Sequence, residues 1–293
     1  MRFKRPNIGS LVGGAAASLL MSASVMAQDS LGKPVEKGYW LQDSATPVMD
    51  ELTRVHNLVF YIICGIVAFV TVLLLYIMIR FREKANPVPS KTSHNTMIEV
   101  VWTIVPVLIL LVMVVPSMQL LYMQDRLPET EMTVKAVGNT WNWEYSYPDY
   151  ENVDSFVSNP LDQTAAKEAG VPYLLATDAA LVVPVDTKIK VLVTSVNNMH
   201  SWAMPSFGVK MDAVPGIINE TWFEVTKEGT FYGQCSEICG AKHYFMPIEV
   251  KAVSKAEFAQ WIANDGEFTT QTASLDAPTS NNMGGGVITA AQK

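Results

Sequence analysis

Two long stretches without a charged side chain constrain the fold of this chain more than any other feature of its sequence. One run of 25 residues between Arg54 and Arg80 has no Asp, Glu, Lys or Arg, and a second run of 25 lies between Glu99 and Asp125. At 1.5 Å per residue, each run is long enough to cross the hydrocarbon core of a bilayer as a helix. The resulting prediction is a transmembrane hairpin over residues 54–126, with helices at about 55–80 and 97–124.

The charges around these runs predict which side of the membrane each part occupies. The loop that joins the two runs carries Arg80, Arg82, Lys84 and Lys91 against Glu83 alone. Because positively charged loops remain in the cytoplasm, this loop is predicted to be cytoplasmic. The segment before the first run and everything after the second run then lie outside.

The N-terminus independently indicates export. Basic residues near the start precede a weakly hydrophobic stretch rich in Gly, Ser and Ala, which ends in the small-x-small sequence Val25-Met26-Ala27. This arrangement is typical of a signal peptide. We expect cleavage of residues 1–27 before Gln28, rather than a third membrane anchor, and then a polar N-terminal tail over residues 28–53.

Beyond the second run, from about Thr133, the sequence changes to short β-branched or aromatic runs separated by Gly, Pro and Asn. Several of them alternate apolar and polar residues, as half-buried strands do. The runs are TVKAVG, WNWEYSY, ALVVPV, KIKVLVTS, TWFEVT, TFYGQ and MPIEVKAV. About seven short strands in roughly 120 residues predict an antiparallel sandwich or barrel. We assign this domain to residues 127–265.

Three segments of this part of the chain differ from the strand pattern. Residues 151–179 are polar and poor in strand signals, which predicts a surface insertion. Ser254 and Glu257 form a capping box that predicts a short helix over KAEFAQWIAN. The tail at 266–293 is rich in Thr, Ser, Asn and Gly, and we expect disorder or processing there.

The net charge of −7 is divided unevenly along the chain. Residues 1–126 carry 11 Lys and Arg against 8 Asp and Glu, whereas residues 127–293 carry 10 Lys, no Arg and 20 Asp and Glu. An acidic exported domain attracts basic partners and repels nucleic acid. Alternatively, these acidic residues form an ordinary solvated surface that recruits no partner.

Soft metal ligands are concentrated in one short segment. Cys235, Cys239 and His243 follow one another at intervals of four, Met246 comes next, and His200 lies 35 residues upstream of the first thiol. Such donors select copper, zinc or iron–sulfur over magnesium or calcium. The glycines on both sides of QCSEIC favour a loop between two strands over a helix face.

Three interpretations of this ligand set are chemically possible. A one-copper electron-transfer site uses two His, one Cys and a weak axial Met, so the extra Cys here would let two copper ions share a pair of bridging sulfurs. A CxxxC disulfide is strained and leaves His200, His243 and Met246 unexplained. A structural zinc site of two Cys and two His is possible, although the nearby methionine favours copper.

The remaining cysteine, Cys64, lies in an apolar run and is expected to be an inert hydrophobe.

Longer motifs around these ligands resemble a known family. The runs GQCSEICGAKHYFMPI, HSWAMPSFGVKMDAVPG and GNTWNWEY are similar to subunit 2 of haem–copper cytochrome c oxidases, over roughly residues 45–262. The resemblance implies an α+β membrane protein in which a two-helix hairpin precedes an all-β, cupredoxin-like Greek-key barrel with a dinuclear copper-A centre. The signal peptide indicates a bacterial form. The expected location is therefore the bacterial inner membrane, with the N-terminus and the copper domain on the periplasmic side.

The resemblance also assigns metal ligands. It implies that copper-A is bound by His200, Cys235, Cys239, His243 and Met246, and by the backbone carbonyl of Glu237. The carboxylate of Glu237 would reach a magnesium or manganese ion at the border with the catalytic subunit. A hard carboxylate fits such a hard ion.

Two further residues receive roles from the resemblance. Trp141 matches the residue at which electrons enter from cytochrome c; the alternative is a core aromatic, a part that Trp143 is expected to play. Glu99 matches an acid at the mouth of a proton path into the catalytic subunit. An ionisable group beside an apolar span is a functional candidate, but an acid also stabilises a helix N-terminus.

Two positions depart from the family pattern. Asn197 stands where the family usually has an acid three residues before the upstream histidine, and Ile217 stands where it usually has an arginine after Pro-Gly. The change at Asn197 puts one acid for docking in doubt. The change at Ile217 puts one polar contact with the catalytic subunit in doubt. Neither is a copper ligand.

The resulting functional hypothesis is an electron-accepting subunit of a respiratory oxidase. Electrons from cytochrome c would pass to copper-A and then to haem in subunit 1, where dioxygen is reduced to water and protons are pumped. Expected partners are subunit 1, subunit 3, cytochrome c and the membrane, with no nucleic acid. The four histidines of this chain are too few for haems and another copper. One alternative is a quinol oxidase subunit of the same fold, but such subunits generally lack the copper ligands. Another is a membrane-anchored copper-delivery protein, but such a protein needs exchangeable ligands.

Overall fold

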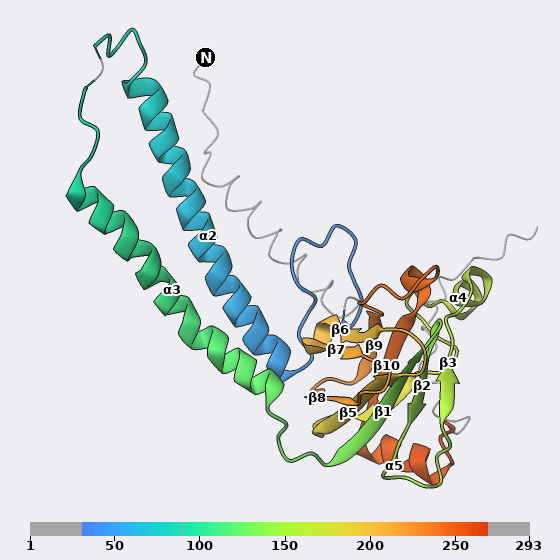
Figure 1. Ribbon diagram of the computed structural model, residues 1–293. Coiled ribbons are helices and arrows are strands. Elements are labelled where there is room, and N and C mark those ends of the chain that lie inside the picture. The colour runs from blue at the N-terminus through green and yellow to red at the C-terminus, as the bar shows by residue number, and fades with distance from the viewer. Residues whose placement is uncertain (1–30, 89, 269–293) are drawn as a thin grey trace, which may run out of the picture.

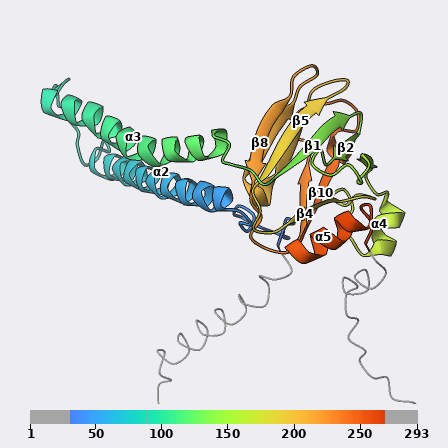
Figure 2. The same cartoon turned by 90° about the horizontal axis from the view of Figure 1, so that it is seen from below.

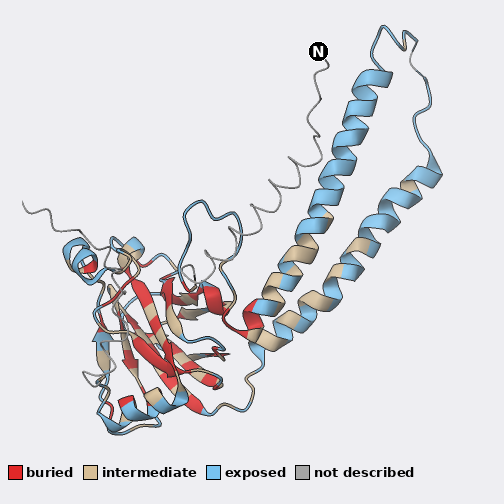
Figure 3. Ribbon diagram, turned by 180° about the vertical axis from the view of Figure 1, so that it is seen from behind, coloured by how far each residue is buried: buried red, intermediate tan, exposed pale blue. Residues whose placement is uncertain are grey.

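The computed structural model describes residues 31–88 and 90–268, and in it two long helices project as a hairpin from a β-rich head (Figure 1). Helix α2 spans Pro47–Arg80 and helix α3 spans Thr96–Asp125. Their most apolar windows have mean hydropathies of 3.0 and 2.8, and no residue of either window is buried. Figure 3 shows both helices exposed over most of their length, in contrast to the buried interior of the head. Two apolar helices without protein cover fit a two-pass membrane protein.

Helix α2 begins earlier than the predicted start near residue 55. Thr46 is its N-cap, with a side chain that accepts a hydrogen bond from the amide of Met49, and Pro47 occupies the first turn. Proline is well suited to this position because its missing N–H would have had no helical partner there. The predicted tail at 28–53 therefore ends in the first two turns of a helix. The predicted signal peptide at 1–27 lies outside the described residues, as does most of the predicted tail at 266–293.

The strands of the head, among the described residues, form three sheets. A five-stranded sheet has the order β3-β2-β1-β5-β8, a three-stranded sheet has the order β4-β10-β9, and β6 pairs with β7. Figure 2 shows β8, β5, β1 and β2 side by side, with β10 and β4 beneath them and α5 at the bottom. The strands are Met132–Asn139 (β1), Asn142–Ser146 (β2), Phe156–Ser158 (β3), Leu181–Pro184 (β4), Ile189–Ser195 (β5), His200–Met204 (β6), Val209–Ala213 (β7), Asn219–Phe223 (β8), Gly229–Gln234 (β9) and Pro247–Val253 (β10).

This arrangement is the expected hairpin of two apolar helices followed by a cupredoxin-like β-domain, with one correction. The described strands make open Greek-key sheets, and no hydrogen-bonded closed barrel joins them. The pairing is also mixed, because β1 runs parallel to β5 and β4 runs parallel to β10. Parallel neighbours require a crossover, so strands from distant parts of the sequence are brought side by side.

The core lies between the sheets and follows the period of two that the sequence shows. Every second residue of β1 and of β5 is buried. Trp143, Trp202, Phe207, Phe223 and Phe231 fill the space between the sheets and are fully buried. Burying one large apolar side chain stabilises a fold by about 1.5–3 kcal/mol, so this aromatic set is a principal source of the rigidity of the head.

Some elements of the head were not predicted. Strands β6 and β7 fall within a run that gave no strand signal, and residues 151–179 contain β3 and helix α4 (Gln163–Ala169). Strand β3 pairs with β2 at the edge of the large sheet, so the expected insertion is partly integrated into the fold. Helix α5 (Lys255–Ala263) begins as predicted, with the hydroxyl of Ser254 accepting a 3.1 Å hydrogen bond from the amide of Glu257.

The hairpin is attached to the head at two places. Residues 42–46, here called the anchor segment, are hydrogen-bonded into the head: Ala45 donates to the carbonyl of Ser206, and the hydroxyl of Thr46 donates to the carbonyl of Phe207 across 2.7 Å. At the other helix, the indole N–H of Trp222 donates to the carbonyl of Met123. Both apolar helices thus meet the head at the ends that are predicted, from the charge pattern, to lie outside the cytoplasm.

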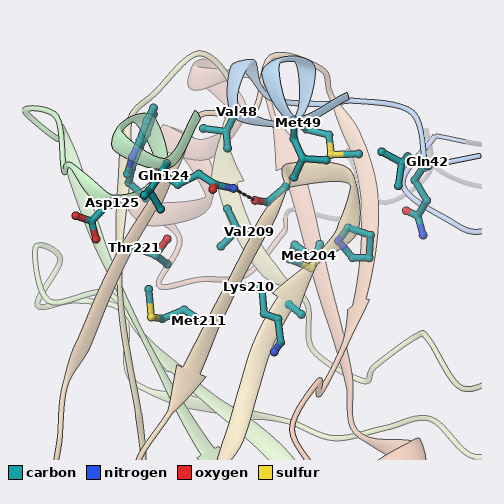
Figure 4. A pocket seen from close by; sticks show the side chains of 17 residues that line it. Gln42, Val48, Met49, Gln124, Asp125, Met204, Val209, Lys210, Met211 and Thr221 are labelled. Carbon is teal, nitrogen blue, oxygen red and sulfur yellow. Dashed lines mark hydrogen bonds between the residues drawn. The ribbon is translucent and has the colours of Figure 1, made fainter. Parts of the chain in front are cut away.

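A pocket of about 510 Å³ lies between these attachments (Figure 4). Gln124 spans its upper part and donates a 3.3 Å hydrogen bond to the carbonyl of Gly208. Val48, Met49, Met204 and Met211 form much of its wall. None of the predicted metal ligands lines this pocket, so the candidate metal centre lies elsewhere in the head.

Candidate metal centre

The predicted ligands come from two parts of the chain that the β-sheets bring together. His200 is the first residue of β6, whereas the other ligands occupy the connection between β9 and β10. These two strands are antiparallel neighbours, and the amide of Cys235 donates a 2.9 Å hydrogen bond to the carbonyl of Met246, which closes the connection into a loop. The expected loop between two strands is therefore present. The single turn η2 (His243–Phe245) places the second imidazole inside this loop.

The donor atoms form one continuous series. His200 Nδ1 lies 3.8 Å from Cys235 Sγ, the two sulfurs lie 3.7 Å apart, and Cys239 Sγ lies 3.6 Å from His243 Nδ1. Met246 Sδ is 4.0 Å from Cys239 Sγ, and the carbonyl of Glu237 is 3.3 Å from Cys235 Sγ. Each histidine thus faces a different cysteine, and the two thiols occupy the middle of the site.

Burial sets the protonation of these groups. Both thiols, His200 and Met246 are buried. Burial, and then the proximity of Cys235, raise the pKa of the Cys239 thiol to about 12. Burial, and then His243, lower the pKa of His200. A neutral imidazole at His200 is ready to coordinate a cation, whereas thiols must lose protons when a metal binds.

The donor set can be tested against the three interpretations. Cys235 and Cys239 are free thiols, and their 3.7 Å separation is far from a covalent S–S bond. The ligand atoms of His200, Cys235 and Cys239 lie within 4.8 Å of one another, which fits a metal site. A buried thioether beside these donors suits copper better than zinc. Sulfur and imidazole donors in a pre-formed buried cluster therefore fit a soft metal.

A second layer of side chains holds the metal-binding loop. The carbonyl of Cys239 accepts a 3.2 Å hydrogen bond from the indole N–H of Trp141 and a 2.7 Å bond from the side-chain amide of Asn198. Gly240, at φ +111°, turns the chain past the Trp141 ring, and a Cβ there would lie 3.4 Å from that ring. Trp141 is half-buried, so part of its side chain is accessible to solvent while its N–H reaches the carbonyl of Cys239.

The imidazole of His200 is enclosed by β1 and β2. A Cβ on Gly138 would lie 2.9 Å from Cδ2 of the ring, so only glycine leaves the ring its present place. Trp143, the partner of Gly138 across β1 and β2, makes an edge contact with the ring at 6.1 Å between centroids and is fully buried. Trp143 is thus the core aromatic of the pair, as expected, and Trp141 is the one that reaches the surface.

Comparison with known proteins agrees with this geometry. The family description "Cytochrome C oxidase subunit II, periplasmic domain" matches residues 132–253, and "Cytochrome C oxidase subunit II, transmembrane domain" matches residues 34–120. The "Probable cytochrome c oxidase subunit 2" of Rickettsia prowazekii (strain Madrid E) is 46% identical over 222 residues, which are 76% of this chain and 70% of the relative. The chain belongs to the cytochrome c oxidase subunit II family.

Further relatives extend the match. The cytochrome c oxidase subunit 2 of Cereibacter sphaeroides is 42% identical over 267 residues, covering 85% of this chain and 88% of the relative. The crystal structure of the periplasmic domain of subunit II of cytochrome oxidase of Bradyrhizobium japonicum shares 44% identity, with a TM-score of 0.43, and covers 48% of this chain and 96% of that one. As a member of the subunit II family, the chain is part of an oxidoreductase complex, and other oxidase subunits are its partners.

The two predicted acidic residues lie in different places. Glu237 lies in the metal-binding loop with a half-buried side chain, and its backbone carbonyl points at Cys235. Glu99 lies in the first turn of α3, behind the N-cap Asn95, at the end of the hairpin away from the head (Figure 1). In this subunit II chain, Glu237 therefore lies beside the candidate donors, and Glu99 lies far from them.

Sequence reasoning missed Gly138 and Asn198 as parts of the site. Gly138 resembles an ordinary strand glycine, although a glycine inside a strand often marks a close approach of another group. Asn198 lies two residues before a ligand, but its bond to Cys239 joins positions 41 residues apart and has no local signal. The positions that hold the ligands are thus less visible in the sequence than the ligands themselves.

Proposed function

We propose that this subunit accepts electrons from cytochrome c at a dinuclear copper-A centre and passes them to haem in subunit 1. There, dioxygen would be reduced to water and protons would be pumped. The observation that carries the proposal is the unbroken series of donors from His200 Nδ1 through the two thiols to His243 Nδ1, at 3.8, 3.7 and 3.6 Å. Two thiols between two imidazoles match a pair of copper ions that share bridging sulfurs.

The residues of the chain prepare this site for electron transfer rather than for substrate chemistry. When bound, copper-A would supply one-electron oxidation and reduction. The side chain of Met246 and the carbonyl of Glu237 would be its weak outer donors. The loop that carries most donors is closed by the hydrogen bond between Cys235 and Met246, and the His200 ring is enclosed by Gly138 and Trp143. Donors held by a packed scaffold move little when charge changes, which favours fast transfer.

Trp141 is the proposed residue at which electrons enter. Its ring is half-buried, and its N–H is bonded to the carbonyl of Cys239, so it joins the surface to a ligand residue. Residues 127–293 carry 20 Asp and Glu against 10 Lys. This acidic head would attract a basic cytochrome c and steer its approach at low ionic strength.

The proposed location is the inner membrane of a bacterium, with the head on the periplasmic side. Arg80, Arg82, Lys84 and Lys91 cluster at the connection of the hairpin, and this connection lies at the far end from the head (Figure 1). If this positively charged connection stays in the cytoplasm, as the positive-inside rule predicts, the head lies outside. The proposed signal peptide at 1–27 supports the same orientation. Subunit 1 and subunit 3 would be the membrane partners of the hairpin.

Glu237 is proposed to bind magnesium or manganese through its carboxylate, at the border with subunit 1. Its half-buried side chain next to the centre supports this role. In oxidase grown with manganese, Glu237→Gln should remove the bound-manganese electron paramagnetic resonance signal while copper content stays unchanged. Bound manganese at the wild-type level in the variant would contradict the assignment.

Glu99 is proposed to lie at the mouth of a proton path into subunit 1. Glu99→Gln should slow steady-state oxygen consumption, while reduction of the centre by cytochrome c in a single turnover stays at the wild-type rate. If Glu99 only stabilises the start of α3, steady-state turnover will not change either. The two assays therefore separate proton delivery from electron transfer.

Metal content and spectrum test the main proposal. The purified oxidase should contain copper bound to this subunit, with the thiolate-to-copper absorption and near-infrared band of a dinuclear centre. A colourless subunit that retains one zinc ion would overturn the proposal. A quinol oxidase subunit would carry no copper here, and a copper-delivery protein would release copper readily to a chelator, whereas the buried donors of this site should retain it.

A further inference from the structure

Asn197, which departs from the family pattern, contacts the far side of a metal ligand. Its Oδ1 lies 3.2 Å from Nε2 of His200, the ring nitrogen that points away from the thiols. The opposite ring nitrogen, Nδ1, lies 3.8 Å from Cys235 Sγ. The amide and the thiol thus contact the two nitrogens of the same imidazole.

The orientation of the Asn197 amide is fixed by its other bonds. Its Nδ2 donates to the hydroxyl of Thr140 across 2.5 Å, and its Oδ1 accepts a 2.8 Å bond from the backbone N–H of Asn198. A flipped amide would direct its NH₂ group at the N–H of Asn198, and two donors would then face each other. The oxygen must therefore be the atom that faces His200.

An acceptor at this place determines the proton position on the ring. Because Oδ1 has no proton to give, Nε2 of His200 must carry the hydrogen and donate it. The neutral ring then has its lone pair on Nδ1, on the side of the thiols. Partners of this kind orient ligating histidines and set their basicity.

The chemical nature of the partner matters as well as its position. A carboxylate would draw the Nε2 proton toward itself and make the imidazole a stronger donor, which stabilises the more highly charged, oxidised metal. A neutral amide accepts the same hydrogen bond without adding negative charge, and charge-assisted bonds are roughly twice as strong as neutral ones.

We propose that Asn197 is a positioning residue that fixes His200 as the Nε2–H tautomer and, as a neutral acceptor, keeps the reduction potential of the centre higher than a carboxylate would. The part concerning the potential rests on the proposed copper function. The part concerning the tautomer does not, because it follows from contacts among protein atoms alone.

The tautomer is testable in the metal-free full-length protein in detergent. The chain has only four histidines, so ¹⁵N-histidine labelling gives a spectrum in which His200 is assigned by its absence in His200→Gln. The ring shifts should report protonated Nε2 and unprotonated Nδ1, and Asn197→Leu should convert them to averaged shifts. Protonated Nδ1 in the wild type, or unchanged shifts in Asn197→Leu, would overturn the assignment.

The effect on potential is testable in the assembled oxidase by spectroelectrochemical titration. Asn197→Asp should lower the midpoint potential of the centre, with wild-type copper content. Ala241→Asp is the matched control, because it adds the same charge to an exposed position of the metal-binding loop without touching His200. A shift in Asn197→Asp no larger than that in Ala241→Asp would show a general charge effect and overturn the proposal.

The two experiments distinguish the possible failures. Absence of copper in the wild-type oxidase would overturn the proposed function and the claim about potential, while the tautomer would still be decided by the metal-free spectrum. Normal copper with an Nδ1–H tautomer would overturn the role of Asn197 alone.

Discussion

The indole N–H of Trp141 donates a 3.2 Å hydrogen bond to the backbone carbonyl of Cys239, whose sulfur occupies the middle of the donor series. A half-buried ring is thereby joined to a buried thiol through one hydrogen bond and a few covalent bonds. Asn198 donates to the same carbonyl, so the peptide that carries the thiol is held from both sides. Because Trp141 is not itself a proposed metal ligand, its contribution to electron entry can be measured in a variant that keeps every donor.

Trp141→Phe should keep the metal and slow electron entry. Phenylalanine retains a ring but loses the N–H, so the link to Cys239 is broken while all donors remain. We expect cytochrome c oxidation to slow by roughly tenfold, which corresponds to about 1.4 kcal/mol in the barrier. Stopped-flow kinetics and copper analysis measure the two effects. Trp40→Phe, in the N-terminal segment, should leave both unchanged, and wild-type kinetics in Trp141→Phe would remove its role.

Cys239→Ser should disrupt the site more than any other single change in the loop. Its sulfur contacts Cys235, His243 and Met246, so it connects the two halves of the donor series. We expect a loss of at least about half of the bound copper, because the remaining donors suffice only for a mononuclear site. Elemental analysis per chain measures this. The control is Cys64→Ser, at an exposed position of α2, which should retain all of the copper; equal copper in both variants would contradict the arrangement.

Gly138→Ala should weaken the site without touching a ligand. The new methyl group would lie 2.9 Å from Cδ2 of His200, closer than real contacts allow. Such overpacking typically costs about 1–3 kcal/mol. We expect a lower Tm and faster loss of copper to a chelator. Gly65→Ala, where nothing lies within 4 Å, should neither lower the Tm nor speed the loss of copper, and an unaltered Gly138→Ala protein would show that the His200 ring is not confined.

Glu249 should make the stability of the head depend on pH. Its carboxyl group accepts a 2.7 Å hydrogen bond from the amide of Thr177, and burial is the main cause that raises its pKa above the ordinary 4.5. Just above pH 4.5, the folded protein therefore binds more protons than the unfolded chain. The free energy of unfolding should therefore fall as the pH rises from 4.5 to the raised pKa of Glu249. The stabilisation from the protonated carboxyl group is present in full only below pH 4.5, the ordinary pKa of a glutamic acid.

Glu249→Gln should flatten this dependence. The neutral amide can accept the Thr177 hydrogen bond at every pH, so the variant should gain stability at neutral pH relative to the wild type. A difference of one pKa unit between the folded and unfolded states corresponds to about 1.4 kcal/mol in the free energy of unfolding, and the substitution removes this difference. Thermal unfolding of the full chain in detergent across a pH series measures the effect. Glu228→Gln, at an exposed position, is the control, and a wild-type pH profile in Glu249→Gln would contradict the assignment.

The membrane helices could be predicted because their signal is local and strong. A run of 25 residues without charge leaves few alternatives, whereas the first turns of α2 contain Asp50, Glu51 and Arg54 and lack that signal. The start at Thr46–Pro47 is visible only as a cap followed by a proline. The boundary was misplaced because these polar turns lie beside the head and not in the apolar region.

The ligands could be predicted from chemistry, but their arrangement could not. Spacing brings Cys235, Cys239 and His243 together, whereas His200 joins them only because β6 begins beside the loop. Strand β6 itself escaped prediction because HSWAM is short, lies against Pro205 and is buried on nearly every residue, so it shows no alternation. Asn197 was visible in the sequence only as a departure, and its contact with His200 required the fold.

The anchor segment at 42–46 has a mechanical consequence. A domain joined to the membrane by one linker can swing about that linker, but this head is fastened both at the start of α2, through Thr46, and in the last turn of α3, through Met123. Two fastenings restrict the movement of the head to rotation about the line that joins them. The proposed copper-binding loop would therefore follow the movement of both helix ends together, so a shift of the hairpin in the membrane would be passed on to the metal centre.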